Sequence, residues 1–352
     1  MTDILFEQTG EWGVVTLNRP QALNALTWDM VKAMRAQLTA WAGARSAVKA
    51  VMVKGAGDKA FCAGGDIRWL HDEAKKDPAG ASEFFREEYR NNSLIYHYPK
   101  PYVAMIDGIV MGGGVGVSVH GDFRVAGDAT LFAMPETGIG LFPDVGGGHF
   151  MPRLHDGLGL YHALSGARAK AADCMAAGIA THYVPSDKLG SLEKALFDTP
   201  LGSLAHADIE AVLDIYAGDP GHAAVNDQRE NIARLFQGHE TLDALMARLK
   251  ADESNFAKET HAALVKMSPT SMRLTFEQMK RGAMLDFDDT MKMEFRIVRR
   301  VMDGHDFFEG VRAQILEKDR NPKWKPASLA EVDHAEIAHY FDHLGDDELV
   351  LP

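Results

Sequence analysis

Cysteine is nearly absent from this chain of 352 residues, which contains only Cys62 and Cys174. Two cysteines this far apart form neither a disulfide framework nor a metal-binding motif, and the count fits a reducing compartment. Three acidic residues precede the first arginine, Arg19, which is not the pattern of a signal or transit peptide. We therefore expect a cytoplasmic protein.

Positive charge and long apolar runs are also scarce. Lys and Arg number 37 against 50 Asp and Glu, and the resulting formal net charge of −13 argues against non-specific nucleic-acid binding, which needs a basic face. The most apolar stretch, residues 103–119, contains Asp107 and five glycines. A membrane span needs about 18 apolar residues, so we expect neither nucleic acid nor a membrane as a partner.

Strand and helix patterns alternate over the first part of the chain. Residues 102–106 are β-branched and apolar, as in a buried strand, and residues 28–42 show helical spacing with Thr27 as the N-cap. Amphipathic helical patterns take over later in the chain. The sequence thus predicts an α/β core over residues 1–199 and a mainly helical region over residues 200–352.

Two glycine-rich loops, Gly64-Gly65 and Gly112 to Gly114, follow predicted strands and lead into predicted helices. Amide groups at a helix start are unpaired and carry the positive end of the helix dipole, and glycine leaves them open to a ligand. If the two strands are neighbours, one amide from each loop points at the same oxygen, as in an oxyanion hole. The alternative is that these glycines only permit close packing of helix on sheet.

Two carboxyl residues, Glu136 and Asp144, lie near these loops in an apolar part of the chain, and each directly follows a proline. Such a carboxyl is either partly buried with a raised pKa, or a turn or helix-start residue satisfied by backbone amides. Two carboxyls beside two candidate oxyanion loops favour catalysis at a thioester or ester carbonyl.

Motifs of other reaction classes are missing. No Gly-Lys-Ser/Thr follows a glycine loop, and the glycine spacing is not that of a dinucleotide site. The segment from Gly116 to His120 lacks the last glycine of a nucleophile elbow, and no zinc-binding His-Glu-x-x-His is present. We expect His120 to be a packed or hydrogen-bonded residue, and we expect no metal and no separate cofactor.

Short segments over the first half of the chain form a characteristic set: residues 17–20, 23–26, 60–66, 100–101, 108, 112–114 and 132–136. In these segments the sequence resembles the enoyl-CoA hydratase/isomerase (crotonase) superfamily. The resemblance implies an α/β fold built as a spiral of ββα units, extended here by the mainly helical C-terminal region. It also implies an acyl-CoA substrate whose thioester oxygen is held by the amides of Gly65 and Gly113.

Other segments resemble a branch of this superfamily that hydrolyses short 3-hydroxyacyl-CoA thioesters, and they include residues 111–121, 141–148 and 304–313. Hydratases hold a water with two glutamates, the first of which would fall at Gly116, where glycine cannot act as an acid or base. The second is kept as Glu136, and Asp144 replaces a glycine of hydratases. The resemblance implies that Glu136 attacks the carbonyl or orients a water. Asp144 then positions the water or the substrate hydroxyl, or supplies a proton.

The same resemblance gives four further candidates, Glu88, Ala25, Ala63 and Lys318. Glu88 matches a substrate-contacting glutamate, although the helix pattern alone predicts that it is solvated. The other three match positions along the CoA path, where Lys318 either faces a phosphate or is a solvated surface lysine. Two alternatives stay open, an enoyl-CoA hydratase or isomerase and a non-catalytic CoA-binding protein. A homo-oligomer is also expected unless the helical C-terminal region covers the same surface.

Overall fold

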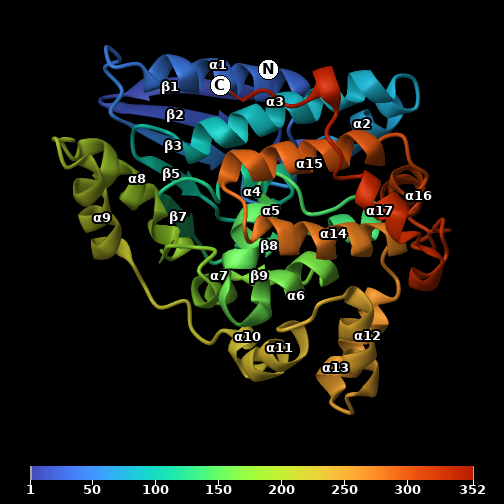
Figure 1. The fold of residues 1–352 in the computed structure, drawn as a ribbon. Helices are drawn as coiled ribbons and strands as arrows, with labels where there is room; N and C mark the ends of the chain where they lie inside the picture. The colour runs from blue at the N-terminus through green and yellow to red at the C-terminus, as the bar shows by residue number, and fades with distance from the viewer. Residues whose placement is uncertain (1, 352) are drawn as a thin grey trace.

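The computed structural model describes residues 2–351 and contains two β-sheets surrounded by helices (Figure 1). The larger sheet has the strand order β1-β2-β3-β5-β7-β10, and all its strands are parallel except β1. Its strands are β1 (Ile4–Thr9), β2 (Trp12–Leu17), β3 (Ala50–Gly55), β5 (Tyr102–Met105), β7 (Phe123–Ala126) and β10 (His182–Tyr183). The smaller sheet consists of β4 (Ala60–Cys62), β6 (Ile109–Met111), β8 (Leu131–Ala133) and an antiparallel edge strand, β9 (Ala169–Lys170).

From β3 to β8, consecutive strands alternate between the two sheets. β3, β5 and β7 belong to the larger sheet, and the strands that directly follow them, β4, β6 and β8, belong to the smaller one. A helix or a 3-10 turn comes after each of these pairs. Each ββα unit therefore adds one strand to each sheet, which produces the spiral that the resemblance predicts.

The helices of the first half are α1 (Trp28–Ala42), α2 (Ile67–Ala74), α3 (Pro78–Tyr96), α4 (Gly113–Gly116), α5 (Gly147–Phe150), α6 (Leu158–Ser165), α7 (Ala171–Ala177) and α8 (Leu189–Asp198). Helix α1 has the predicted bounds and the predicted cap, since the Thr27 hydroxyl accepts a hydrogen bond of 3.2 Å from the Met30 amide. Its apolar stripe, which includes Met34 and Leu38, is buried as its 3.6-residue period requires.

The two faces of the larger sheet are covered by different helices because side chains alternate along each strand. Ala50 and Met52 of β3 face a cluster that includes Leu196 of α8 and Leu213 of α9 (Ala205–Tyr216). Their neighbours on the strand face the main core, which α1 and α3 help to form. Helices α8 and α9 stand on either side of the boundary predicted after residue 199, and they pack over the same sheet face. The domain boundary itself stays a prediction.

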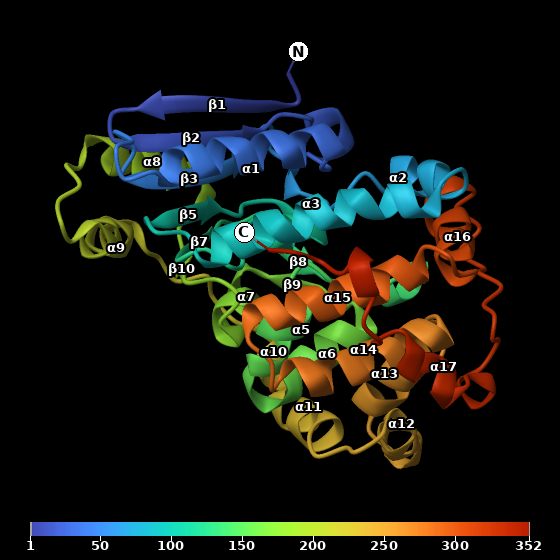
Figure 2. The same ribbon diagram turned by 45° about the horizontal axis from the view of Figure 1, so that its top comes forward.

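The remaining helices are α10 (Ala224–Asp227), α11 (Arg229–Phe236), α12 (Leu242–Ala251), α13 (Asn255–Leu264), α14 (Pro269–Gly282), α15 (Phe287–Val301), α16 (Asp306–Val311) and α17 (His334–His339). Figures 1 and 2 show α15 running alongside α3, with α14 next to it. Met272 of α14 and Phe295 of α15 belong to the same buried cluster as Phe84 of α3. The helical C-terminal region thus packs directly on the α/β core.

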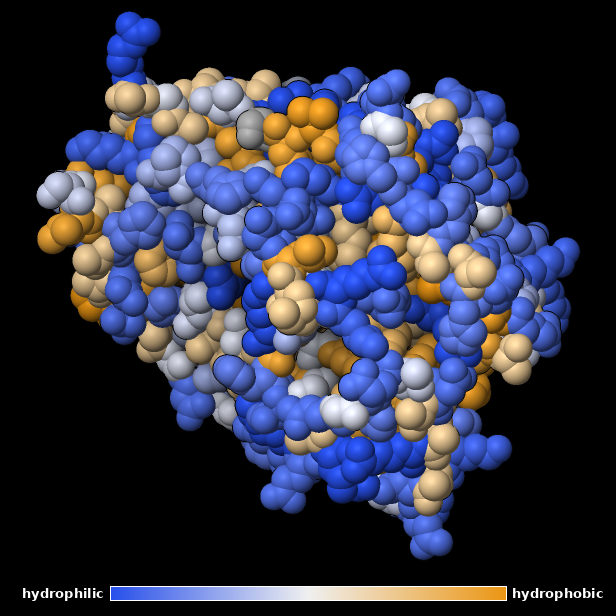
Figure 3. Space-filling view, in the orientation of Figure 1, coloured by the Kyte–Doolittle hydropathy of each residue, from blue (hydrophilic) through white to orange (hydrophobic). Residues whose placement is uncertain are grey.

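Hydrophilic residues predominate on the face drawn in Figure 3, and apolar areas are scattered among them. Within residues 2–351, no helix combines the length and the apolar character that crossing a membrane requires. No cluster of metal-ligating side chains is found in the same residues.

Candidate active site

Three parallel strands of the smaller sheet deliver the predicted site residues to one edge. Strand β4 pairs with β6, and β6 pairs with β8, in a parallel register that aligns their carboxyl ends. The loops that follow these strands carry Gly65, Gly113 and Glu136 respectively. The strands of the two glycine loops are therefore neighbours, which is the condition under which their amides converge.

The two glycine loops lie against one another. A Cβ atom built on Gly113 would lie 3.4 Å from the amide nitrogen of Gly65, and one built on Gly64 would lie 3.7 Å from the amide nitrogen of Gly113. Within residues 2–351 neither the Gly65 nor the Gly113 amide donates a hydrogen bond to another protein group. Unpaired amides in a partly buried site are costly unless a ligand or water accepts from them.

Glycine is required at the second loop for two reasons. Gly112 has a φ of +47°, a left-handed conformation that side chains rarely adopt. At Gly113 an added Cβ would lie only 2.5 Å from Oε1 of Glu88. The loop therefore combines an unusual backbone turn with a close approach of a carboxyl group, and close packing of helix on sheet explains neither feature.

A cavity of about 950 Å³ opens at this edge of the sheet. Ala63, Gly65 and Gly113 line it, together with Glu136 and Asp144. Its other walls come from α2, α3, the segment 265–267 and the segment 314–324 near the C-terminus. The two loops and the two predicted carboxyls therefore face one common space.

Glu136 and Asp144 are both buried, with 5% and 4% of their surface exposed. Burial raises the pKa of Asp144 to about 7, against the effect of a hydrogen bond of 2.8 Å from the Tyr89 hydroxyl, which lowers it. Burial also raises the pKa of Glu136 well above its usual value, and the nearby charge of Asp144 raises it further. Among the residues that the structure describes, Oε2 of Glu136 has no hydrogen-bond partner. The two carboxyl groups thus interact within one apolar pocket.

Glu88 is a third buried carboxyl in the cavity, so the expectation of a solvated side chain is wrong. Glu88 is 2% exposed, and its Oε1 has no hydrogen-bond partner in the described part of the chain, residues 2–351. The neighbouring Glu87 instead pairs with Arg35 and Arg90 near the surface. Burial raises the pKa of Glu88 well above its usual value, and the charge of Asp144 adds to this. The periodicity does explain its position, because Glu88 follows Phe84 by four residues on the buried face of α3.

The space beside Gly116 is already filled. A Cβ atom built on Gly116 would lie 2.7 Å from Nδ2 of Asn92 and 2.7 Å from Cβ of Val145. The first glutamate of a hydratase would have to occupy this space. The local packing therefore supports the distinction from hydratases that the sequence suggested.

Two of the four further candidates, Ala25 and Lys318, are not part of the cavity lining. The carbonyl of Ala25 accepts a hydrogen bond of 2.7 Å from Arg19. Lys318 is exposed and has a φ of +59°. Its neighbours Arg320 and Asn321 do line the cavity, so Lys318 belongs to a segment that borders the site without itself forming the wall.

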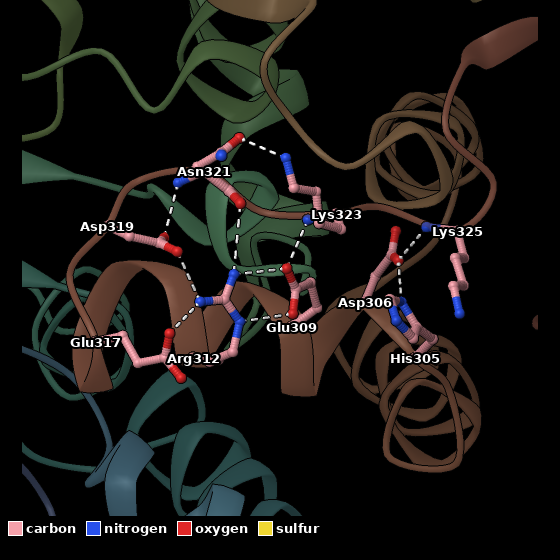
Figure 4. Close-up of polar contacts among 9 residues, drawn as sticks. All are labelled: His305, Asp306, Glu309, Arg312, Glu317, Asp319, Asn321, Lys323 and Lys325. Carbon is pink, nitrogen blue, oxygen red and sulfur yellow. Dashed lines mark hydrogen bonds and ion pairs between the residues drawn. The ribbon is translucent and has the colours of Figure 1, made fainter.

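That segment, residues 317–325, is held by Arg312 (Figure 4). The guanidinium makes two hydrogen bonds of 2.8 Å to Glu309, and its Nη1 contacts Glu317 at 2.5 Å and Asp319 at 2.8 Å. Glu309 in turn accepts a hydrogen bond of 2.6 Å from the Lys323 amide. Bidentate geometry and several shared partners make this network stronger than isolated surface ion pairs.

Sequence reasoning missed three polar residues around Asp144. Tyr89 donates to its carboxyl group, and Gln278 and Glu294 bind the backbone on either side of it. All three lie on helices whose periodicity predicts only that these positions face the core. Polar residues at core-facing helical positions are the one signal that could have identified them, because buried polar groups need partners.

The chain belongs to the enoyl-CoA hydratase/isomerase family. A sequence model of that family, described as "Enoyl-CoA hydratase/isomerase", matches residues 12–341. Among the similar curated proteins, the "3-hydroxyisobutyryl-CoA hydrolase, mitochondrial" of Danio rerio is 49% identical over 99% of this chain and 92% of its own length. The protein of the same name from Homo sapiens is 45% identical over 99% of this chain and 90% of its own length.

Solved structures confirm the fold. A carnitinyl-CoA dehydratase from Mycobacterium thermoresistibile has a TM-score of 0.91 and 41% identity, covering 99% of this chain and 98% of its own. An enoyl-CoA hydratase from Rhodobacter sphaeroides has a TM-score of 0.90 and 36% identity, covering 99% of this chain and all of its own. Both matches span the helical C-terminal region as well as the α/β core.

The cytoplasmic location expected from the sequence is wrong by this comparison. The similar curated proteins from fish, frog and human are all named as mitochondrial. A low cysteine count indicates only that disulfides are not needed, and it does not distinguish one reducing compartment from another.

Proposed function

We propose that this chain hydrolyses the thioester of a short 3-hydroxyacyl-CoA, with 3-hydroxyisobutyryl-CoA as its substrate in valine catabolism. The products are 3-hydroxyisobutyrate and CoA. Full-length relatives named as 3-hydroxyisobutyryl-CoA hydrolase confirm the enzyme class, an acyl-CoA thioester hydrolase. The observation that carries the assignment of residues is the pair of unpaired amides facing a cavity that holds buried carboxyl groups.

The first proposed step is attack on the thioester carbonyl while its oxygen accepts hydrogen bonds from Gly65 and Gly113. Attack places negative charge on that oxygen, and two fixed amide donors stabilise the charge without reorganisation. The adjacency of the two loops supports this role. The intermediate then collapses as the bond between carbon and sulfur breaks, and the CoA sulfur takes up a proton.

Glu136 and Asp144 supply the groups that form the new bond and move the proton. In one route a Glu136 oxygen attacks the carbonyl carbon and forms an anhydride, which water then hydrolyses. In the other route Glu136 takes a proton from a water that attacks directly. In both routes Asp144 positions the water or the substrate hydroxyl, or supplies the proton for sulfur. Quenching a turnover with hydroxylamine separates the routes, because only the anhydride converts Glu136 into a hydroxamate detectable by mass spectrometry.

The remaining wall residues suit the two ends of the substrate. The unpartnered Oε1 of Glu88 fits the 3-hydroxyl of the acyl group, since a buried carboxyl oxygen without a partner is costly. Arg168, Lys266 and Arg320 line the same cavity and fit the phosphates of CoA. CoA is part of the substrate, and the proposed reaction uses no separate cofactor.

An enoyl-CoA hydratase is the second candidate, because both solved structures reported above are named for hydration or dehydration. By the family resemblance, hydration uses two glutamates, and the first of them would fall at Gly116. Asn92 and Val145 occupy the space that its side chain would need. The hydrolase is therefore the better supported function.

The test is thiol release from a panel of short acyl-CoA thioesters with and without a 3-hydroxyl group. We expect 3-hydroxyisobutyryl-CoA to be hydrolysed with the highest kcat/KM, and crotonyl-CoA to keep its enoyl absorbance. Loss of the crotonyl-CoA absorbance without thiol release would establish the hydratase instead. Tight CoA binding with no reaction on any substrate would establish a non-catalytic binding protein.

A further inference from the structure

The loop that carries Asp144 is held in an unfavourable backbone conformation. Val145 has a φ of +51°, a left-handed conformation that is a genuine outlier for a β-branched residue. Strain of this kind is unfavourable and persists only where the surrounding contacts hold the backbone in place. The strained residue directly follows Asp144, so whatever holds Val145 in place also fixes the direction of the Asp144 side chain.

Three side chains from distant elements hold this loop by its backbone. Nε2 of Gln278 donates to the carbonyl of Pro143 at 2.7 Å, and Nε2 of His120 donates to the carbonyl of Val145 at 2.6 Å. The carboxyl group of Glu294 accepts from the amides of Gly146 and Gly148, at 2.8 Å each. Glu294 also accepts from Gln278 at 3.0 Å.

Glu294 is the centre of this arrangement. It is fully buried on α15, and each of its two oxygens binds one backbone amide on the C-terminal side of Asp144. Burying a carboxyl group is expensive, and apolar residues of similar volume often stabilise a fold more. The carboxyl group of Glu294 accepts hydrogen bonds from two backbone amides of a strained loop, which an apolar side chain cannot do.

We propose that Glu294 is a positioning residue for hydrolysis, which holds the strained loop 143–148 so that Asp144 points into the cavity beside Glu136. This inference rests on the proposed function. It gives the C-terminal helices an indirect role in the reaction, because α15 supplies Glu294 and α14 supplies Gln278. Glu294 itself does not line the cavity, so it acts through the backbone of the loop.

The experiment compares two variants that disturb the hydrogen bonds between Glu294 and the loop. One changes the side chain of Glu294, and the other changes the loop itself. Glu294→Gln replaces one acceptor oxygen by an NH₂ group that faces an amide donor. Gly148→Ala keeps the carboxylate but displaces it, because the new Cβ would lie 2.9 Å from Oε1 of Glu294. For both we expect kcat to fall by about 10- to 100-fold with KM changed less than about twofold, as for other supporting residues whose loss misplaces a reacting group.

The matched control is Asp173→Asn. Asp173 is also a mostly buried carboxylate that accepts two backbone amides, from Lys170 at 3.1 Å and Val225 at 2.9 Å, but it lies away from the cavity lining. Asp173→Asn should lower the melting temperature without lowering kcat. If the role of Glu294 were purely structural, Glu294→Gln would also lower the melting temperature and leave kcat unchanged.

The outcomes separate this inference from the proposed function. A wild-type chain that hydrolyses no short 3-hydroxyacyl-CoA defeats the proposed function. A wild-type chain that is active, with a folded Glu294→Gln variant that keeps the wild-type kcat, defeats only the inference. If Glu294→Gln does not fold, Gly148→Ala decides: a reduced kcat supports the positioning role, and an unchanged kcat rejects it.

Discussion

The hydroxyl of Tyr89 donates a hydrogen bond of 2.8 Å to Oδ2 of Asp144. Among the carboxyl groups that line the cavity within residues 2–351, only that of Asp144 has its charged form stabilised by a side-chain donor, whereas Glu88 and Glu136 each have a buried oxygen without a partner. Three carboxyl groups in one apolar pocket do not ionise together, since like charges repel. The contact therefore indicates that Asp144 carries the first negative charge as the pH rises.

The first prediction concerns the pH profile. Both proposed routes need one negative charge on the Glu136/Asp144 pair, which lies on Glu136 with the proton on Asp144 when the new bond forms. The pair gains its first charge with the pKa of Asp144, which is about 7. We expect kcat/KM to rise with pH through a midpoint near 7. The hydrogen bond from Tyr89 lowers the pKa of Asp144, so Tyr89→Phe should move this midpoint to higher pH. A profile whose midpoint stays the same in Tyr89→Phe would exclude this role for Tyr89.

A second prediction concerns stability. The pKa of Asp144 is about 7 in the folded protein, against about 3.9 in an unfolded chain. As the pH rises from about 4 to about 7, the unfolded chain loses a proton that the folded protein keeps, so stability is lost over this window. Asp144→Asn has no proton to lose. We expect it to melt at a higher temperature than the wild type at pH 8, with the difference shrinking toward pH 4. A difference that does not depend on pH would contradict the raised pKa.

The third prediction tests the amide pair. A Cβ added at Gly113 would lie 2.5 Å from Oε1 of Glu88 and 3.1 Å from Cδ1 of Leu26, so Gly113→Ala must displace these side chains, and its new methyl group would lie 3.4 Å from the Gly65 amide nitrogen. We expect kcat/KM to fall by about 100- to 1000-fold, because the methyl group keeps the thioester oxygen away from the Gly65 amide and so removes one of its two donors. Gly190→Ala is the control, because no atom lies within 4 Å of its added Cβ and its φ is not positive. Equal activity of the two variants would argue against an oxyanion hole at Gly113.

The fourth prediction concerns the segment that Arg312 holds. Arg312→Gln removes its contacts to Glu309, Glu317 and Asp319, and thereby loosens the wall formed by residues 320–322. Ordering a loosened side chain on binding costs about 0.5–1.5 kcal/mol, so we expect KM for the CoA thioester to rise about 3- to 10-fold with kcat unchanged.

The control for that measurement is twofold. The N-acetylcysteamine thioester lacks the nucleotide of CoA, so its kcat/KM should stay the same in Arg312→Gln. Arg299→Gln breaks a comparable pair of surface contacts, to Asp303 and Asp347, that lie away from the cavity, and it should leave both substrates unaffected. A loss of kcat with both thioesters would show that the segment affects the chemistry itself.

The parts of this site that are local in sequence could be predicted. A strand, a glycine loop and a helix leave a pattern within about ten residues, and Glu136 and Asp144 stand out beside it as carboxyl residues in apolar surroundings. Glu88 could have been placed by the same reasoning, since it lies on the helical face of Phe84 and Phe85.

The parts that depend on distant contacts could not be predicted. Tyr89 lies 55 residues from Asp144, and Glu294 lies 148 residues from Gly146. On its own helix each occupies an ordinary core-facing position, and nothing in its neighbourhood indicates which loop it meets. Only the packing of α15 beside α3 brings both helices to the loop that carries Asp144.

The most direct test of the account measures thiol release from 3-hydroxyisobutyryl-CoA by the wild type and by Glu136→Gln and Asp144→Asn. These substitutions keep the size of each side chain, so CoA binding measured by calorimetry should change little. We expect kcat to fall on the order of 100- to 10 000-fold in each, the range for loss of a group that transfers protons in the transition state. If both folded variants retain the wild-type kcat, Glu136 and Asp144 are not the catalytic pair.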